Sequence, residues 1–332
     1  MISIQAFAKE AEKEVKEYLL KSKIAAECEV IENVKNNNTI KNGIRIQGQE
    51  NLLGVVIYLE QLYADYQKGK EMKEVVSDII GIYNNNYIRE GSFEYSRMKD
   101  FDEIKDNLRV KLINQEANKK DLKNIPHKIV EDLAVIYQLM MPSEPGKMEI
   151  GTVKITDQFK ELWNVDLETL HNTAMENTKK LFKPTLKTMD SIMREMMTGE
   201  AGCDYFTDKE AFLQQEKNAM YVLTNEQKMF GAVNILYPEI LSSITEVIPE
   251  GYYILPSSIH ETILVPKKDS MSIKELGAMV REINMNEVAK EEILSDRVYE
   301  YDKQARSFKQ AEESIAREVK KEPTKPTKGR SR

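Results

Sequence analysis

The chain has 332 residues, of which 41% are hydrophobic and 31% are charged, and its formal net charge is −7. This composition is typical of a globular protein with a substantial core, and no apolar run approaches the ~20 residues of a membrane span. The charge is uneven: residues 320–332 hold six basic residues and one acidic residue, so the rest of the chain is acidic, which argues against broad binding to nucleic-acid phosphates.

The cysteines and the N-terminal sequence predict a cytoplasmic protein. Cys28 and Cys203 are the only cysteines and lie far apart, so we expect no disulfide framework. The first residues, MISIQAFAKEAEKEVKEYLL, lack the basic start and apolar core of a secretory signal. Their apolar residues recur at helical spacing instead, so we expect a helix over residues 3–20.

The first part of the chain, residues 1–92, is predicted to form an α+β unit with a β-hairpin. The hairpin is expected to pair residues 28–34 with 39–46 around Asn36, Asn37 and Asn38, because Asn tolerates the left-handed backbone of a tight turn. Two helices are predicted after it, over residues 55–69 and 71–87, with a break near Gly69.

A main α+β domain is predicted over residues 93–310. It is expected to begin with three strands, over residues 108–114, 128–141 and 148–155. A helix should follow between Phe159 and Phe182, with Asp166 in the N-cap position. We expect this helix to pack by burying Trp163, Leu167, Leu170 and Ala174. A Met-rich helix, MDSIMREMM, comes next.

The remaining elements alternate between strands and capped helices. Thr207–Glu210 and Ser272–Glu275 match the capping box, in which a hydroxyl and a carboxylate lie three residues apart. The patterns predict strands over 219–224, 252–255, 260–265 and 297–308, helices over 229–246 and 272–284, and a basic disordered tail over 311–332. The predicted fold class is α+β, with a mixed, mainly antiparallel sheet and helices packed on its faces.

Residues 255–261, LPSSIHE, are the strongest candidates for an enzyme site, because they bring hydroxyls, an imidazole and a carboxylate together. On an extended strand, Ser258 and His260 would share a face with Cα atoms roughly 6.5 Å apart. That spacing suits two groups facing one ligand better than a nucleophile touching its base. The structural alternative is a hairpin turn, with Pro256 in its first central position.

Asp132 is a second candidate, because it interrupts the apolar run of residues 128–141. A carboxylate on a buried strand could have a raised pKa and act as a general base. If Asp132 lay beside Glu261, the two carboxylates could divide acid and base roles. The alternative is a residue at a strand end that binds backbone N–H groups or a basic side chain.

The sequence predicts neither a metal site nor a bound cofactor. His127, His171 and His260 lie in three separate segments, and no HxxxH or CxxC spacing occurs. The glycines form neither GxxxxGK[ST] nor GxGxxG, so nucleotide binding by those routes is not expected.

Four segments resemble the bacterial family catalogued as domain of unknown function 5688: VKNNNTIKNGIRI, VKLINQEANKKDLKNIPHKIVEDLAVIY, WNVDLETLHNTAMENTKKLFKP, and YVLTNEQKMFGAVNILYPEILSSITEVIPEGYYILPSSIHETILVP. The Trp-containing segment and the PSSIHE region also resemble, more distantly, the family numbered 1444. The resemblance implies a bacterial protein and carries no activity, cofactor or catalytic residue over to this chain.

The leading functional hypothesis is therefore a non-enzymatic binding or regulatory protein that acts on another protein. The alternative is a hydrolase-like enzyme whose site gathers Ser258, His260, Glu261 and Asp132. A weaker alternative is a nucleic-acid-associated factor that uses the basic tail.

Overall fold

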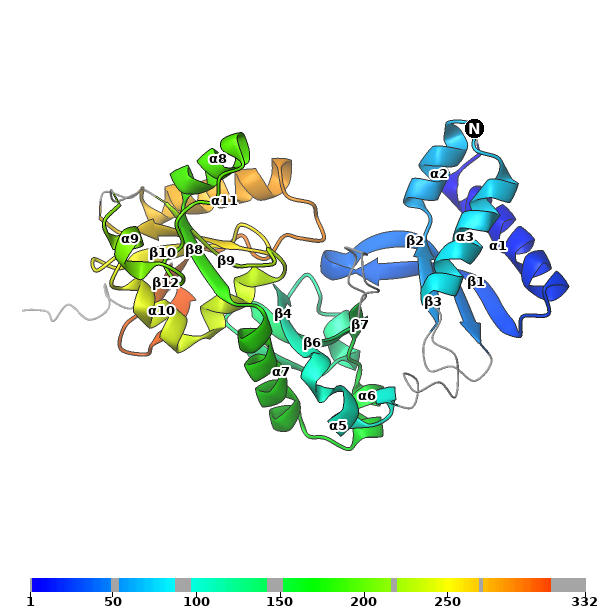
Figure 1. Cartoon of the computed structure of the whole chain (residues 1–332), viewed down its shortest axis with the longest axis horizontal. Helices are drawn as coiled ribbons and strands as arrows, with labels where there is room; N and C mark the ends of the chain where they lie inside the picture. Colours follow the sequence, from blue (N-terminus) through cyan, green and yellow to red (C-terminus); the bar gives the residue numbers. More distant parts are fainter. Residues whose placement is uncertain are drawn as a thin grey trace, which may run out of the picture. The chain divides into compact units, whose positions relative to one another are not determined.

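The computed structural model describes residues 2–48, 54–86, 97–141, 152–215, 220–268 and 271–311. The chain divides into two compact units (Figure 1). The N-terminal unit comprises Met1–Asp106 and Gln158–Val165, and the C-terminal unit comprises Asn107–Asp157 and Asp166–Arg332. The domain limit predicted at residue 92 and nearly all of the predicted tail lie outside the described residues, so both stay predictions.

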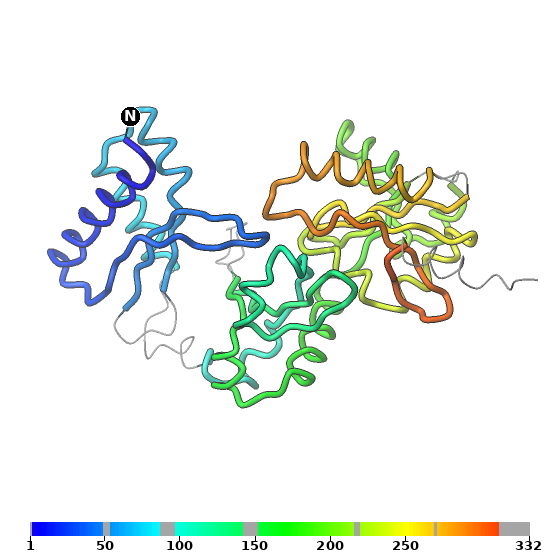
Figure 2. The backbone as a smooth tube through the Cα atoms, turned by 180° about the vertical axis from the view of Figure 1, so that it is seen from behind, coloured from blue at the N-terminus to red at the C-terminus, as the bar shows by residue number. Residues whose placement is uncertain are grey.

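The N-terminal unit contains a three-stranded antiparallel sheet of order β1-β2-β3, formed by β1 (Ala26–Lys35), β2 (Thr39–Gly48) and β3 (Val55–Tyr58). The predicted hairpin is confirmed, because β1 and β2 pair continuously from Ala26↔Gly48 to Lys35↔Thr39. Asn37 and Asn38 in its turn have φ of 58° and 52°. The hairpin extends past β3, which pairs with Gly43–Ile46 alone, and Figure 2 shows it as a projecting arm.

Helices α1 (Ile4–Lys21), α2 (Glu60–Gln67) and α3 (Met72–Asn86) complete this unit. Phe7 of α1 and Ile79 of α3 are fully buried in one apolar cluster with Ile44 of β2 and Ile57 of β3. The prediction of a helix from residue 55 was wrong for its first four residues. They are rich in β-branched side chains and form β3 instead.

The short helix α5 (Phe101–Ile104) and, from Gln158 on, the short helix α6 (Asp157–Trp163) also belong to the N-terminal unit. The indole of Trp163 donates a hydrogen bond to the carbonyl of Met98 at 2.9 Å. The rings of Phe101 and Phe159 lie 5.8 and 5.2 Å from the Trp163 ring, centroid to centroid. Trp163 is therefore a packing residue of this unit.

The prediction of one helix carrying Trp163, Leu167, Leu170 and Ala174 was wrong. Asn164 adopts a left-handed conformation with φ of 51°, which ends α6, and a second helix, α7 (Leu167–Leu181), begins after it. The predicted cap is confirmed, since Asp166 accepts from the N–H of Thr169 at 2.7 Å. Leu170 and Ala174 are fully buried in the C-terminal unit, whereas Leu167 is only half-buried.

One sheet of the C-terminal unit consists of β4 (Leu108–Asn114), β5 (His127–Val130), β6 (Leu133–Met140) and β7 (Thr152–Lys154), with β6 paired to the other three. The single strand predicted over 128–141 is instead the hairpin β5–β6. Val130 pairs with Leu133 across a two-residue turn, and Glu131 there has φ of 56°. On β4, the N–H of Val110 donates to the hydroxyl of Thr178 on α7 at 3.0 Å.

The second sheet of this unit has the order β13-β12-β10-β11-β9-β8 and every pairing in it is antiparallel. Its strands are β8 (Pro184–Thr188), β9 (Tyr221–Asn225), β10 (Tyr252–Leu255), β11 (Thr262–Pro266), β12 (Tyr299–Asp302) and β13 (Ser307–Gln310). The strand predicted over 297–308 is thus a hairpin, β12–β13. The predicted α+β class with mainly antiparallel pairing is confirmed.

The helices of this unit are α7, α8 (Met189–Thr198), α9 (Lys209–Leu213), α10 (Pro238–Ile244) and α11 (Ile273–Asn286). The capping box at Ser272 and Glu275 is confirmed, whereas Asp208, rather than Thr207, caps α9. The helix predicted over 229–246 is divided into a 3-10 turn (Gly231–Leu236) and α10, because Pro238 favours a helix start. No described helix is both long and apolar enough to cross a membrane.

The buried cluster of the N-terminal unit yields a stability prediction. Ile44→Ala removes a fully buried side chain and should lower the free energy of unfolding by about 2–5 kcal/mol, measured by urea denaturation. Ile40→Ala, on the same strand but with an exposed side chain, is the matched control and should cost less than about 0.5 kcal/mol. Equal losses from the two variants would contradict the placement of this core.

Candidate functional site

The structure places the predicted polar residues in two loops. Ser258, His260 and Glu261 lie in the connection between β10 and β11, and Asp132 lies in the β5–β6 turn. The Ser258 hydroxyl accepts a hydrogen bond from the backbone N–H of His260 at 3.0 Å, rather than contacting the imidazole. Glu261 accepts from the hydroxyl of Ser257 at 3.3 Å.

The His260 ring is held by three contacts. Its Nδ1 accepts from the N–H of Phe230 at 3.2 Å, and the ring stacks on the Phe230 ring with centroids 5.5 Å apart. Its Nε2 lies 3.6 Å from a carboxylate oxygen of Glu292. Burial, assisted by the nearby Lys111 ammonium and opposed by Glu292, holds the pKa of His260 below its ordinary value of 6.5. This imidazole is therefore neutral near pH 7 and is occupied in fixing the loop.

The carboxylate of Asp132 accepts hydrogen bonds from three uncharged donors. They are the hydroxyls of Ser295 at 2.8 Å and Tyr299 at 2.7 Å, and the amide of Gln310 at 3.3 Å. These donors come from β12, β13 and the segment before β12, so Asp132 joins the first sheet of the unit to the second.

One connecting segment, residues 292–299, contacts both loops. The N–H of Ile259 donates to the carbonyl of Glu292 at 2.8 Å, and Ser295 and Tyr299 bind Asp132. Both loops thus contact the same segment, residues 292–299. Asp132 and His260 nevertheless belong to separate hydrogen-bond networks. Their catalytic role stays a hypothesis.

The remaining polar and titratable side chains bear on two further kinds of site, a metal site and a hollow. Among the described residues, no three His, Cys, Asp or Glu side chains are grouped as metal ligands. A hollow of about 370 Å³ in the N-terminal unit is lined by Lys16, Cys28, Glu29 and Arg45, among others. Burial raises the pKa of the Cys28 thiol to about 11, so this cysteine is not a thiolate near neutral pH.

Helix α8 is capped at both ends. The hydroxyl of Thr188 accepts from the N–H of Ser191 at 3.1 Å, which caps the first turn. Gly199 ends the helix in a left-handed conformation with φ of 75°. Both ends of the helix are therefore fixed by local contacts.

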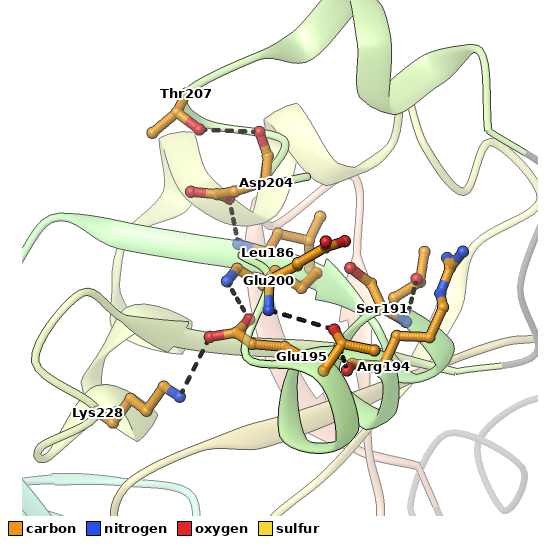
Figure 3. Close-up of polar contacts among 11 residues, drawn as sticks. Leu186, Ser191, Arg194, Glu195, Glu200, Asp204, Thr207 and Lys228 are labelled. Carbon is orange, nitrogen blue, oxygen red and sulfur yellow. Dashed lines mark hydrogen bonds and ion pairs between the residues drawn. The ribbon is translucent and has the colours of Figure 1, made fainter. Parts of the chain in front are cut away.

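The side of α8 that faces the protein is polar. Ser191 is only 4% exposed, and a Cβ added at Gly202 would collide with its hydroxyl, so the loop after α8 lies directly against this side. Glu195 accepts from Lys187 of β8 at 2.6 Å and lies 3.8 Å from Lys228, as Figure 3 shows for Lys228. The Lys187 ammonium holds the pKa of Glu195 below its usual range.

The loop beyond Gly202 covers the edge of the second sheet. Asp204 accepts from the N–H of Leu186 at 2.8 Å and of Phe206 at 3.2 Å, and the N–H of Tyr205 donates to the carbonyl of Leu186. Figure 3 shows Asp204 above Leu186. These bonds occupy the backbone N–H and carbonyl of Leu186 on the outer edge of β8, which hinders the addition of another strand there.

The outer side of α8 is apolar. Met193, Met196 and Met197 are 49%, 79% and 85% exposed, and their spacing of i, i+3 and i+4 places them on one face. At about 100° per residue, this face lies opposite Ser191 and Glu195. We call these three residues the Met face.

Arg194 borders the Met face. In Figure 3 its side chain points away from that of Glu195. It makes no ion pair with any residue that the structure describes. Sequence reasoning found a Met-rich helix here but missed the Met face; the spacing of the methionines was the available signal.

The comparisons with known proteins identify a family for the chain. The model of a family of unknown function, DUF5688, matches residues 4–303. No curated protein and no solved structure matches the chain.

The Asp132 network predicts a structural effect. Asp132→Ala leaves the buried hydroxyl of Tyr299 without its acceptor, so the free energy of unfolding should fall by about 2–4 kcal/mol in urea denaturation. Glu131→Ala, in the same turn but with a longer bond of 3.4 Å to Gln310, is the control and should cost much less. An unchanged or increased stability of the Asp132 variant would indicate a strained group kept for chemistry.

The lowered pKa of His260 predicts a pH dependence of stability. Unfolding returns His260 to its ordinary pKa, so below about pH 6.5 the unfolded chain binds more protons and the unfolding free energy falls as the pH falls. His260→Gln keeps an acceptor for Phe230 but cannot titrate, so its stability should change less between pH 7.5 and 5.5.

The contribution of His171, whose pKa is also lowered by burial, should persist in the His260 variant. Chemical denaturation at a series of pH values measures both slopes. An identical slope in the His260→Gln variant would contradict the burial argument.

Proposed function

The chain belongs to the DUF5688 family of unknown function, and we propose that it is a non-enzymatic protein-binding module of this family. In this proposal α8 inserts the Met face into an apolar groove of a partner protein, and an acidic group at the rim of the groove pairs with Arg194. The observation that carries the proposal is the orientation of α8, with Ser191 and Glu195 inward and the methionines outward.

The Met face has the chemistry of a docking helix. Helices that bind grooves present anchors at i, i+3, i+4 spacing, and Met adapts its shape to uneven apolar surfaces. Fully burying a Met side chain is worth about 1.5–3 kcal/mol. Because Thr188 and Gly199 already fix the ends of α8, little conformational entropy would be lost on binding.

A protein groove fits α8 better than a membrane surface. Helices that lie on membranes carry Lys and Arg along their polar face. Helix α8 has Asp190, Glu195 and Arg194 as its charged residues, and the whole chain has a net charge of −7. An anionic lipid surface would therefore repel it, whereas Arg194, which has no ion-pair partner among the described residues, favours a partner with an acidic rim.

The source and the cellular compartment of the protein are also part of the proposal. We take the chain to be a bacterial cytoplasmic protein, which is supported by the two free thiols, Cys28 and Cys203, and by the resemblance in its sequence. Binding ranks ahead of hydrolysis because Asp132 and His260 are engaged in bonds that hold loops together. The nucleic-acid alternative depends on residues 320–332, which lie outside the described residues.

Site-specific cross-linking tests the proposal in cells that naturally make the protein. Met197→p-benzoylphenylalanine should form a discrete adduct with one protein under ultraviolet light. Met285→p-benzoylphenylalanine is the matched control, because Met285 is 83% exposed on α11, outside the Met face. Adducts with lipid, adducts with a second copy of the chain, or the same adducts at both positions would contradict the proposal.

The cross-linked protein must then bind directly. With both proteins purified, Met196→Glu and Met197→Glu should each weaken binding at least about tenfold by isothermal titration calorimetry, whereas Met285→Glu should leave it unchanged. Arg194→Glu should weaken binding and reduce its dependence on salt. Full affinity in the Met197→Glu variant would refute the Met face as the docking surface.

A further inference from the structure

The exposed thioethers of α8 have a chemistry beyond apolar contact. Met196 and Met197 are 79% and 85% exposed, so both sulfur atoms are open to dissolved oxidants. Oxidation of Met to its sulfoxide turns a flexible apolar side chain into a polar one, and methionine sulfoxide reductases reverse it. Met98, by contrast, is 4% exposed and its carbonyl accepts from Trp163 in the N-terminal unit.

We propose that Met196 and Met197 are a reversible oxidation site that switches the Met face between an apolar and a polar state. The oxidant is a peroxide of the hydrogen peroxide class. One oxygen atom passes to the sulfur as the O–O bond breaks and an S–O bond forms; the sulfur loses two electrons, and the other oxygen leaves as water. A thiol-dependent reductase returns the thioether, as two thiols become a disulfide and the oxygen leaves as water. The effect on docking rests on the function proposed above.

The contacts that hold α8 in place lie on the side of the helix opposite Met196 and Met197. The helix is held by its cap at Thr188, by the contact of Ser191 with Gly202, and by the ion pair of Glu195 with Lys187. None of these contacts uses a methionine side chain. Sulfoxides at 196 and 197 would therefore face water and leave the fold unchanged.

The same change acts strongly on binding to an apolar surface. A sulfoxide oxygen entering an apolar groove loses its hydrogen bonds to water, and its desolvation opposes docking. With two adjacent sulfoxides we expect affinity for an apolar surface to fall at least about tenfold. Reduction should restore it, because the reductase removes the added oxygen and returns the apolar thioethers.

The test uses the full chain and a phenyl-substituted chromatography matrix as the apolar probe. Hydrogen peroxide is added in steps, peptide mass spectrometry follows oxidation at each methionine, and retention on the matrix is measured at each step. Thermal unfolding by circular dichroism checks the fold. The key variant, Met196→Leu with Met197→Leu, keeps the face apolar but cannot be oxidised there; Met285→Leu is the matched control.

The expected results are specific. Wild type and Met285→Leu should become oxidised early at 196 and 197 and lose retention with an unchanged melting temperature, and methionine sulfoxide reductase with dithiothreitol should restore retention. Met285 is 83% exposed and should be oxidised as well, but it lies outside the Met face, so the double Leu variant should keep most of its retention. Slow oxidation at 196 and 197, unchanged retention, loss of retention by the double variant, or unfolding in step with oxidation would each overturn the switch.

The switch and the docking function fail in distinguishable ways. If retention falls on oxidation but no protein cross-links at Met197, the docking proposal is refuted and the oxidation site stands. If a purified partner binds the oxidised and reduced chains equally, docking through α8 can stand and the switch is refuted.

Discussion

The ion pair between Lys187 and Glu195 is the charged contact that ties the inward side of α8 to β8. The two side chains are 18% and 25% exposed and their charged atoms lie 2.6 Å apart, so they are better shielded from water than most surface pairs. Together with the close contact of Ser191 and Gly202, this pair points the polar side of the helix inward. The methionines are therefore left on the outer side of α8, against the arrangement that hydrophobicity alone favours.

The polar residues that looked most like an active site have a structural explanation. A connection between two sheets creates buried backbone and side-chain groups that need partners. Asp132 meets this need for Tyr299 and Ser295, and the β10–β11 loop is held through Ile259 and Glu292. Dense polar sequence at such a junction therefore reflects the geometry of two packed sheets as readily as catalysis.

Local signals in the sequence were enough to predict the elements that depend on a few neighbouring residues. The Asn36–Asn38 turn, the Asp166 cap and the Ser272 capping box are all set by contacts within about four positions, and all three were predicted. The two-residue turn at Glu131 was missed, because the strands on either side have the same apolar composition and only one residue adopts a left-handed backbone. The end of α6 was missed for a similar reason, because it depends on the left-handed backbone of one residue, Asn164.

The outward direction of the Met face could not be predicted from the sequence, for a different reason. The spacing of Met193, Met196 and Met197 defines a face, but the direction of that face depends on Lys187, Gly202 and Lys228, which come from a strand and two loops. A pattern within one helix does not show which side of the helix packs against the rest of the protein. The exposed methionines are thus a product of the tertiary structure.

The accessibility of the methionine methyl groups to water is the most direct test of this orientation. With ¹³C-labelled methionine methyls, a soluble gadolinium chelate should broaden the NMR signals of Met196 and Met197 as strongly as that of the exposed Met285. It should leave the signal of the buried Met98 nearly unchanged. Protection of Met196 and Met197 to the level of Met98 would show that α8 faces inward and would contradict the docking surface.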